Sequence, residues 1–348
     1  LIRRQRQMCI RDRDDILENV SGSGTLNKNG AAKLTFNAAD NAGFNGTAVV
    51  NDGLLETIGA NTGALDFNTK INSGKFNYTA ADGASLAIGG SGTPKVAFGQ
   101  AGQNAIAQFN NGIYTIAGDI LNITGNNVVF DNSTIKLSQD TYSNGNYTIQ
   151  NSIIDLANGL TETKTFGNLT TDNAHLKMDV DLTLPNAKSD QLIANSGSGT
   201  LQIVLTDIKV LDKTDNGLNQ PNPYIINVLG GGLTFDEDKS LGAWSTDVYE
   251  YDVQTKGQNL TLTAIKAATN KSLKAMNDIV GTRGFQFTSN DGNPYKIAES
   301  LGTTQNGIFT VNGVDNGSTV ISGEDSKSLF EVTQKTDLTV NNLSLIHI

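Results

Sequence analysis

The sequence predicts an all-β protein in which short strands stack as a right-handed parallel β-helix, followed by a β-rich cap. The first observation is composition, because the 348-residue chain has 37 Gly, abundant Asn, Thr, Asp and Ser, and only 5 Pro. Gly and Asn favour tight turns, whereas Thr, Val and Ile favour strands. The second is a succession of short segments in which apolar and polar residues alternate, which places one face of each strand in a core. The third is a series of Asn-Gly and Asp-Gly turn signals between those segments.

The two ends of the chain resemble a translated sequencing adapter. Residues Leu343–Ile348 can be encoded by DNA whose opposite strand encodes Met8–Arg13, so the two ends match one transposon-derived adapter in opposite orientations. We therefore expect residues 1–13 and 343–348 to be adapter-derived and exclude them from the fold prediction. Their exclusion removes the only cysteine, Cys9, and every arginine except Arg283, and it makes the formal charge more negative than −10.

Residues 14–160 are expected to form the β-solenoid. Asn-Gly and Asp-Gly pairs also make good hairpin turns, so the turn signals alone do not distinguish a solenoid from a β-sandwich. The stretch Ile120–Leu137 favours the solenoid, because it fits three short strands with gaps of a few residues, as in one coil of a β-helix. Asn and Thr at successive bends are expected to stack as ladders. The repeat is degenerate, and its period cannot be read from the sequence. The expected strands include Lys33–Asn37, Thr47–Asn51, Lys75–Thr79, Lys95–Phe98, Ile120–Thr124, Asn127–Phe130, Thr134–Leu137 and Tyr147–Gln150.

Two segments are similar to autotransporter passengers, the exported domains of type V secretion. Gly22–Phe36 (GSGTLNKNGAAKLTF) and Phe44–Leu55 (FNGTAVVNDGLL) resemble the passenger-associated repeat, with departures at Ala32, where Gly is usual, and at Phe44, where Tyr is usual. Residues 166–266 resemble the C-terminal cap of pertactin-like passengers, and Ser189-Asp-Gln-Leu is the most specific piece of that match. The match is partial, because the family usually has an aromatic residue near Leu260–Leu262. The resemblance implies a β-helix whose cap assists folding during secretion.

The expected organisation follows from these segments. Residues 161–266 are assigned to an autochaperone-like β cap and 267–282 to a short linker, for which the helical spacing of its apolar residues allows a helix. Residues 283–342 are expected to begin a further β-rich module in the place where a membrane barrel would follow an ordinary passenger.

Several functional classes are disfavoured by composition. An acidic chain with so few arginines is poorly suited to nucleic acid or to anionic lipid, and no apolar run is long enough for a transmembrane helix. Without Cys9, the chain lacks a catalytic cysteine and the His and Cys ligands of a zinc site. His175 has no supporting motif for a catalytic triad. We therefore expect no cofactor, no metal site and no catalytic residues.

The enzymatic alternative is polysaccharide cleavage. A sugar hydrolase needs two carboxylates across the scissile bond, and the candidates are Asp179 with Asp181, or Asp236, Glu237 and Asp238. Solvated strand faces and turns explain these residues more simply, and we favour that interpretation. Calcium at Asp236–Asp238 or Asp291–Asn293 lacks an EF-hand or other calcium-binding repeat. The aromatic residues Trp244, Tyr249 and Tyr251 have the chemistry to stack on sugars, but packing within the cap is the favoured interpretation.

The sequence as a whole favours a non-catalytic adhesin or stalk at the bacterial cell surface or secreted from it. The expected partners are a host or surface glycan or protein and, for the full-length protein, the outer-membrane translocation machinery. Besides the sugar-cleaving enzyme, a self-assembling surface-layer protein remains an alternative. The residues do not identify the ligand, because adhesin specificity lies in faces and loops without a common motif.

Overall fold

The structure is a computed structural model that describes residues 14–88, 96–117, 120, 123–182, 187–212, 224–245 and 249–267, together with short strands between Gly284 and Ile346. The leader 1–13, Arg283 and the linker 267–282, apart from Ala267, lie outside the described residues. Among the described residues the secondary structure is β, with one short 3-10 helix, η1 (Leu205–Asp207). The predicted all-β class is thus confirmed.

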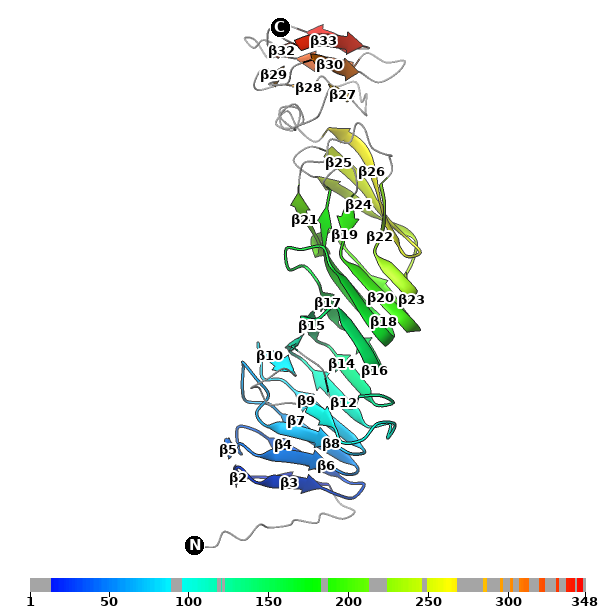
Figure 1. Ribbon diagram of the computed structural model, residues 1–348. Coiled ribbons are helices and arrows are strands. Elements are labelled where there is room, and N and C mark those ends of the chain that lie inside the picture. Colours follow the sequence, from blue (N-terminus) through cyan, green and yellow to red (C-terminus); the bar gives the residue numbers. More distant parts are fainter. Residues whose placement is uncertain are drawn as a thin grey trace.

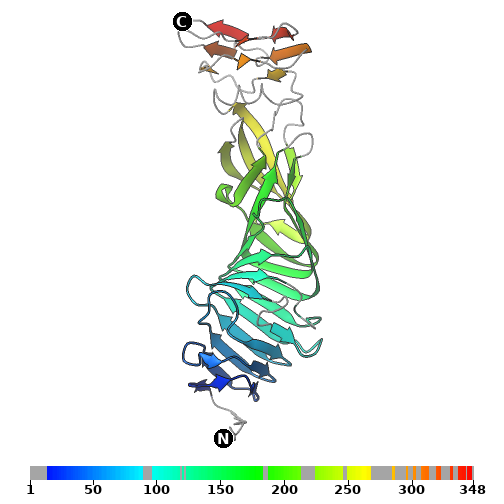
Figure 2. The ribbon, with the colours of Figure 1, turned by 60° about the vertical axis from the view of Figure 1, so that its left-hand side comes forward.

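The strands form an elongated stack of coils (Figures 1 and 2). The first face is a continuous parallel ladder of β1 (Asp15–Leu17), β4 (Lys33–Asn37), β7 (Leu54–Ile58), β9 (Lys75–Thr79), β12 (Ile106–Asn110), β14 (Asn127–Asp131), β16 (Thr141–Gln150), β18 (Thr163–Asp181), β20 (Gln191–Gln202) and β23 (Leu229–Phe235). The second face contains β3 (Thr25–Lys28), β6 (Thr47–Val50), β8 (Asn68–Ile71) and β11 (Val96–Phe98). The third contains β10 (Ser85–Ile88), β13 (Ile113–Ile116), β15 (Thr134–Leu137) and β17 (Ile153–Asp155). A short parallel pair, β2 (Ser21–Gly22) with β5 (Gly43–Phe44), lies at one corner.

The turn signals are corners of coils and not hairpins. Asp52-Gly53 joins β6 to β7, yet β6 pairs with β3 and β8, whereas β7 pairs with β4 and β9. At this corner Gly53 has a φ of +68°, and a Cβ on it would lie 2.4 Å from the Gly30 carbonyl oxygen of the preceding coil. Only glycine therefore fits there. The parallel β-helix is confirmed over the hairpin-built sandwich.

The register fixes the coil period that the sequence leaves open. Leu34 pairs with Leu55, and Leu55 pairs with Phe76. One coil in this part of the chain therefore takes 21 residues, which is also the separation of the hydrogen-bonded Asn51 and Asn72. The next partner of Phe76 is Ala107, because a longer excursion lies between β9 and β12. Such insertions hide the period from sequence inspection.

Inward-facing side chains of successive coils form the core. On the first face, Phe109 pairs in register with Tyr78 below and Phe130 above, and each of these side chains is at most 1% exposed. The rings of Phe109 and Phe130 stack with centroids 5.4 Å apart. Burial alternates along the strands, as in the pattern of Lys33–Asn37, whose Leu34 and Phe36 face inward. The alternation predicted from sequence thus identifies the core face.

Seven of the eight predicted strands overlap observed ones, although Asn51 follows the end of β6 and Lys95 lies outside the described residues. Lys33–Asn37, Lys75–Thr79 and Thr134–Leu137 have the predicted bounds. In Ile120–Thr124, however, the described residues Ile120, Ile123 and Thr124 are not in a strand, and Leu121 and Asn122 lie outside the described residues. Ile120 and Ile123 are each 3% exposed and contribute to the core from irregular backbone. The apolar pattern at Ile120 and Ile123 therefore indicates burial, although neither residue lies in a strand.

Parallel pairing continues past residue 160, the position assigned to the end of the solenoid. The long strand β18 pairs in parallel with β16 and β17 and then with β20, and β20 pairs with β23. Its outer end also pairs with β21 (Ile208–Asp212) in parallel and with β19 (Lys188–Ser189) in antiparallel orientation. An antiparallel sheet then covers this end of the stack: β22 (Tyr224–Asn227), β26 (Asn259–Ala267), β25 (Tyr249–Lys256) and β24 (Lys239–Ser245).

The remaining described strands belong to the segment expected to begin a further β-rich module. They pair in parallel in three small sheets: β27 (Gly284–Gln286), β30 (Gly307–Asn312) and β33 (Thr336–Asn341); β28 (Tyr295–Lys296), β31 (Thr319–Ser322) and β34 (Leu343–Ile346); and β29 (Leu301–Gly302) with β32 (Phe330–Glu331). The strand β34 falls within the tail that resembles adapter sequence.

Candidate functional site

Four asparagines mark one corner of successive coils. Asn111 lies between β12 and β13, Asn132 between β14 and β15, Asn151 between β16 and β17, and Asn173 at the bend of β18. All four have left-handed backbone, with φ of 59°, 48°, 47° and 49°. Asparagine tolerates this conformation better than most residues with a side chain. The corner therefore selects asparagine for its backbone and also exposes a carboxamide on each of these four coils.

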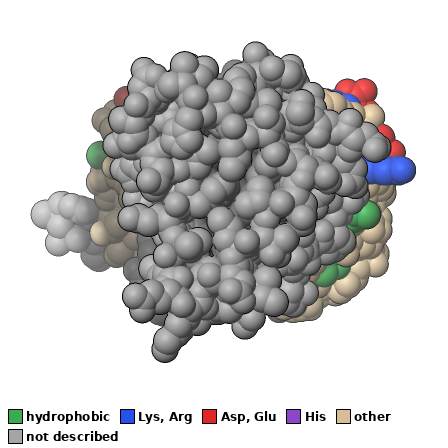
Figure 3. Space-filling view, turned by 90° about the horizontal axis from the view of Figure 1, so that it is seen from above, with side chains coloured by type: hydrophobic (Ala, Val, Ile, Leu, Met, Phe, Trp, Pro, Cys, Tyr) green, Lys and Arg blue, Asp and Glu red, His purple; other side chains and the backbone are tan. Residues whose placement is uncertain are grey.

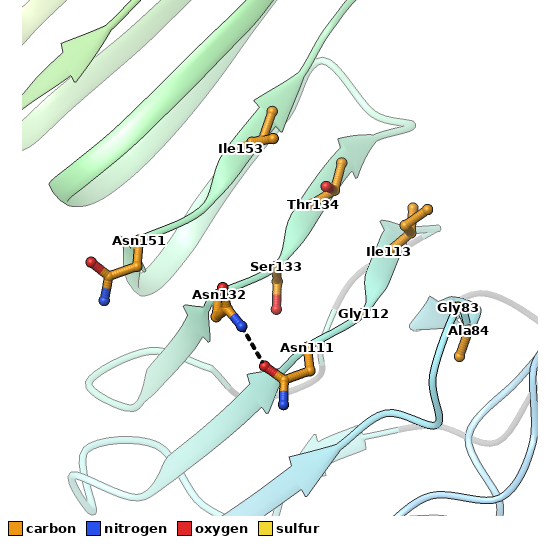
Figure 4. Close-up of a pocket in the computed structure, with 10 residues that line it drawn as sticks. All are labelled: Gly83, Ala84, Asn111, Gly112, Ile113, Asn132, Ser133, Thr134, Asn151 and Ile153. Atoms are coloured by element: carbon orange, nitrogen blue, oxygen red, sulfur yellow. Dashed lines mark hydrogen bonds between the residues drawn. The ribbon is translucent and has the colours of Figure 1, made fainter.

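The exposed carboxamides bond to one another along the stack. Asn132 Nδ2 donates to Asn111 Oδ1 at 2.6 Å (Figure 4). Asn173 Nδ2 donates to Asn151 Oδ1 at 3.0 Å. The two pairs are not directly joined, because Asn151 Nδ2 donates instead to the Asp131 carboxylate at 3.0 Å. We call Asn111, Asn132, Asn151 and Asn173 the asparagine corner.

A second ladder stands at another corner, nearer the N-terminus. Asn72 Nδ2 donates to Asn51 Oδ1 at 2.6 Å, and Asn51 Nδ2 donates to Asn29 Oδ1 at 2.8 Å. These bonds, together with those of the asparagine corner, confirm the asparagine ladders predicted from sequence. No comparable threonine ladder is found among the hydrogen bonds of the described residues.

A hollow of about 320 Å³ opens beside the asparagine corner (Figure 4). None of its lining residues is charged, although the chain carries a net charge of −10. Ile153, which is 39% exposed, contributes apolar surface beside the carboxamides. Sequence reasoning missed this hollow because its residues come from four coils and share no motif. The lining residues are Gly83, Ala84, Asn111, Gly112, Ile113, Asn132, Ser133, Thr134, Asn151 and Ile153.

The carboxylates proposed for sugar cleavage lie elsewhere, and the pair Asp179 and Asp181 does not share an exposed face. Asp179 is 0% exposed, and its Oδ2 accepts a hydrogen bond from the Gly159 N–H at 2.6 Å. Asp181 is only partly buried. The register of β18 against β21 shifts between Val180 and Asp181. This irregularity breaks the alternation from which the shared face was predicted.

Asp179 instead packs beside Asp190, the aspartate of the Ser-Asp-Gln-Leu element. Asp190 is 0% exposed, and its two carboxylate oxygens accept 2.7 Å hydrogen bonds from the backbone N–H groups of Glu162 and Asp179. Burial raises the pKa of Asp190 to about 6, and the negative charges of Asp179 and Glu162 add to that effect against the two backbone hydrogen bonds. This carboxylate therefore connects the backbone at Glu162 and at Asp179 to the segment that carries Asp190.

The remaining acidic candidates and the histidine are not brought together. Asp236, Glu237 and Asp238 are exposed in the turn after β23, where Asp238 accepts from the Gly257 N–H and Glu237 pairs with Lys239. His175 lies on β18 with its Nδ1 4.0 Å from an Asp207 carboxylate oxygen. Within the described residues no group of three His, Cys, Asp or Glu is placed to hold a metal ion. Asp291–Asn293 and Cys9 lie outside those residues.

The described aromatic residues of the cap lie in the core or pack against it. Tyr251 is 0% exposed, and its ring lies edge-on to that of Tyr224 with centroids 6.3 Å apart. Trp244 is partly buried and packs against the core. The side chain of Tyr249 lies outside the described residues. Tyr251 is therefore closed to a sugar, whereas Trp244 packs part of its surface against the core.

A buried lysine closes the corner below β7. Lys28 is 2% exposed and pairs in register with Val50, so its side chain enters the core column. Its Nζ donates to the Asp52 carbonyl oxygen at 2.9 Å and to the carbonyl oxygens of Asn29 and Gly30. Burial lowers the pKa of Lys28, partly offset by the charge of Asp52. The lysine thus satisfies carbonyl groups of two coils.

Comparisons with known proteins give one structural likeness. No family model matches the chain, and the search of curated proteins returns no significant match. The fold is similar to the crystal structure of the Haemophilus influenzae Hap adhesin, with a TM-score of 0.39 and 14% sequence identity over 69% of this chain. The chain spans 24% of that protein's length. No helix among the described residues has the length and apolar character needed to cross a membrane.

Proposed function

We propose that this chain is a non-catalytic adhesin or stalk of the bacterial cell surface, and that it is part of an autotransporter passenger. The observation that carries the proposal is the unbroken parallel ladder from β1 to β23, with an antiparallel sheet covering its end (Figure 1). A stack of this kind is a rod whose length grows with each coil and whose outer faces present repeated surface. The cap sheet protects the last coil from edge-to-edge pairing.

The placement of the acidic residues supports a binding role over sugar cleavage. Asp179 and Asp190 use carboxylate oxygens to hold backbone N–H groups inside the fold. The hollow at the asparagine corner has no carboxylate in its lining, whereas glycosidic hydrolysis usually requires a pair. Seen along the stack, the visible described rim is mostly backbone and side chains that are neither charged nor hydrophobic, with scattered hydrophobic side chains and a group of acidic and basic side chains on the right (Figure 3).

An adhesion assay tests the proposal. The purified 348-residue chain, coupled to fluorescent microspheres, is expected to retain them on epithelial cells or on bacterial cells above the level of albumin-coated spheres. The same preparation is expected to release no reducing ends and no unsaturated products from a panel of polysaccharides. Cleavage of any polysaccharide, or retention no greater than with albumin on both cell types, would overturn the proposal.

A further inference from the structure

We propose that the hollow at the asparagine corner is a binding site for a neutral glycan. This inference rests on the proposed adhesin function and assigns a ligand class to one place on the rod. The hollow combines exposed carboxamides from three coils with aliphatic surface from Ile113 and Ile153. A sugar ring has the matching chemistry, because its hydroxyl groups lie at the rim and its C–H groups form apolar faces.

The carboxamides retain hydrogen-bonding capacity for such a ligand. A carboxamide has two N–H donors and an oxygen with two lone pairs. Within the described residues, Asn132 uses one N–H in its bond to Asn111. Its side chain is exposed, and no protein group of the described residues bonds to its oxygen or second N–H. Because donor and acceptor lie on one planar group, a carboxamide can bind two adjacent hydroxyl groups at once.

The absence of charge from the lining selects against ionic ligands. The ten lining residues include no Asp, Glu, Lys or Arg, so an acidic sugar would find no cation to pair with. The carboxylate at the ladder, Asp131, is outside the lining and accepts from Asn151. Its negative charge further disfavours acidic ligands by Coulomb repulsion.

An extended peptide is a poorer match than a glycan. A peptide binds a β-protein most often by adding a strand to a free sheet edge. At this corner the backbone N–H groups of Asn111, Asn132 and Asn151 already donate to carbonyl oxygens of the next coil, those of Asp131, Gln150 and Asp172. The stack therefore offers no free N–H edge here. Successive coils lie roughly 4.8 Å apart, a spacing close to the repeat of an extended chain of hexoses.

Substitution of Asn132 by glycine tests the site. Asn132→Gly removes the carboxamide at the centre of the hollow, and glycine accepts the positive φ without strain. The matched control is Asn51→Gly, which removes the middle rung of the other ladder. Asn132→Gly loses one ladder bond and Asn51→Gly loses two, so the loss of ladder bonds does not explain weaker glycan binding in Asn132→Gly alone. Circular dichroism and the urea midpoint confirm that both variants fold.

The probe is an array of immobilised neutral and acidic oligosaccharides and uncharged ten-residue peptides. Wild-type chain is expected to bind neutral glycans, with binding about tenfold weaker in N132G, as for the loss of one or two hydrogen bonds, and unchanged in N51G. Binding confined to acidic glycans or peptides, no binding, or equal loss in both variants would overturn the inference. Microsphere adhesion separates the two proposals: if N132G adheres like wild type, the glycan site fails and the adhesin function stands, whereas an inert wild type refutes the adhesin function.

Discussion

Truncation of Phe109 should weaken the packing between the coil that carries it and the coils on either side. Phe109 is 0% exposed, and its ring lies within 5.3–6.4 Å of the rings of Tyr114, Phe130 and Phe76. Phe109→Ala therefore leaves a cavity between coils, and we expect it to cost about 4 kcal/mol of unfolding free energy, within the range for buried phenylalanines. In a stacked repeat the loss falls on the two interfaces that the ring makes.

Hydrogen exchange at intermediate urea concentrations tests whether the loss of stability is confined to the coils around Phe109. Peptides covering β9, β12 and β14 should lose protection at lower urea in Phe109→Ala than in wild type, while those of β18 and β20 keep theirs. The control is Ile16→Ala, since Ile16 is 62% exposed and its truncation should cost less than about 1 kcal/mol. Equal loss of protection along the whole chain, or a cost no larger than in the control, would refute the interpretation of the core as stacked nearest-neighbour layers.

Three further predictions concern buried polar groups. The pKa of Asp190, raised to about 6, means that the folded state holds this proton more tightly than the unfolded chain. The contribution of protonated Asp190 to stability is therefore greatest below about pH 4. The free energy of unfolding falls by on the order of 2–3 kcal/mol as pH rises through 6. Urea midpoints at several pH values should show that loss in wild type but not in Asp190→Asn, and identical pH profiles would contradict it. Thr57 is 0% exposed, and its hydroxyl has no hydrogen-bond partner among the described residues, so Thr57→Val should stabilise the fold by about 1–2 kcal/mol; a lower melting temperature would show that the hydroxyl has a partner. Lys28→Met removes the donor for three carbonyl oxygens and should destabilise by about 1–3 kcal/mol, and a gain in urea midpoint would mean that desolvation of the amine outweighs its bonds.

The sequence predicts the strands and the ladders because both depend on local rules. Apolar alternation identifies Lys33–Asn37 and Lys75–Thr79 with their observed bounds, and repeated asparagines at bends meet once coils stack. Features that depend on the register between coils could not be predicted from the sequence. The longer excursion between Phe76 and Ala107 hides the period, and the irregularity beside Val180 separates Asp179 from Asp181.

The hollow at the asparagine corner could not be predicted for the same reason. Asn111, Asn132 and Asn151 are single residues on separate coils, and each alone fits an ordinary turn. Their left-handed backbone explains why asparagine occurs at the bends, whereas their shared position emerges only from the register of β12, β14 and β16.

The most direct test of the parallel β-helix is disulfide trapping in a Cys9→Ser background. Val49 pairs in register with Lys70 of the next coil, and strands roughly 4.8 Å apart lie within the Cα separation that a disulfide accepts. A hairpin turning at Asp52-Gly53 would instead place Val49 opposite Glu56. We predict that Val49→Cys with Lys70→Cys oxidises readily to an intramolecular disulfide and that Val49→Cys with Glu56→Cys does not. The reverse result would contradict the stacked parallel coils on which the proposed adhesin rod depends.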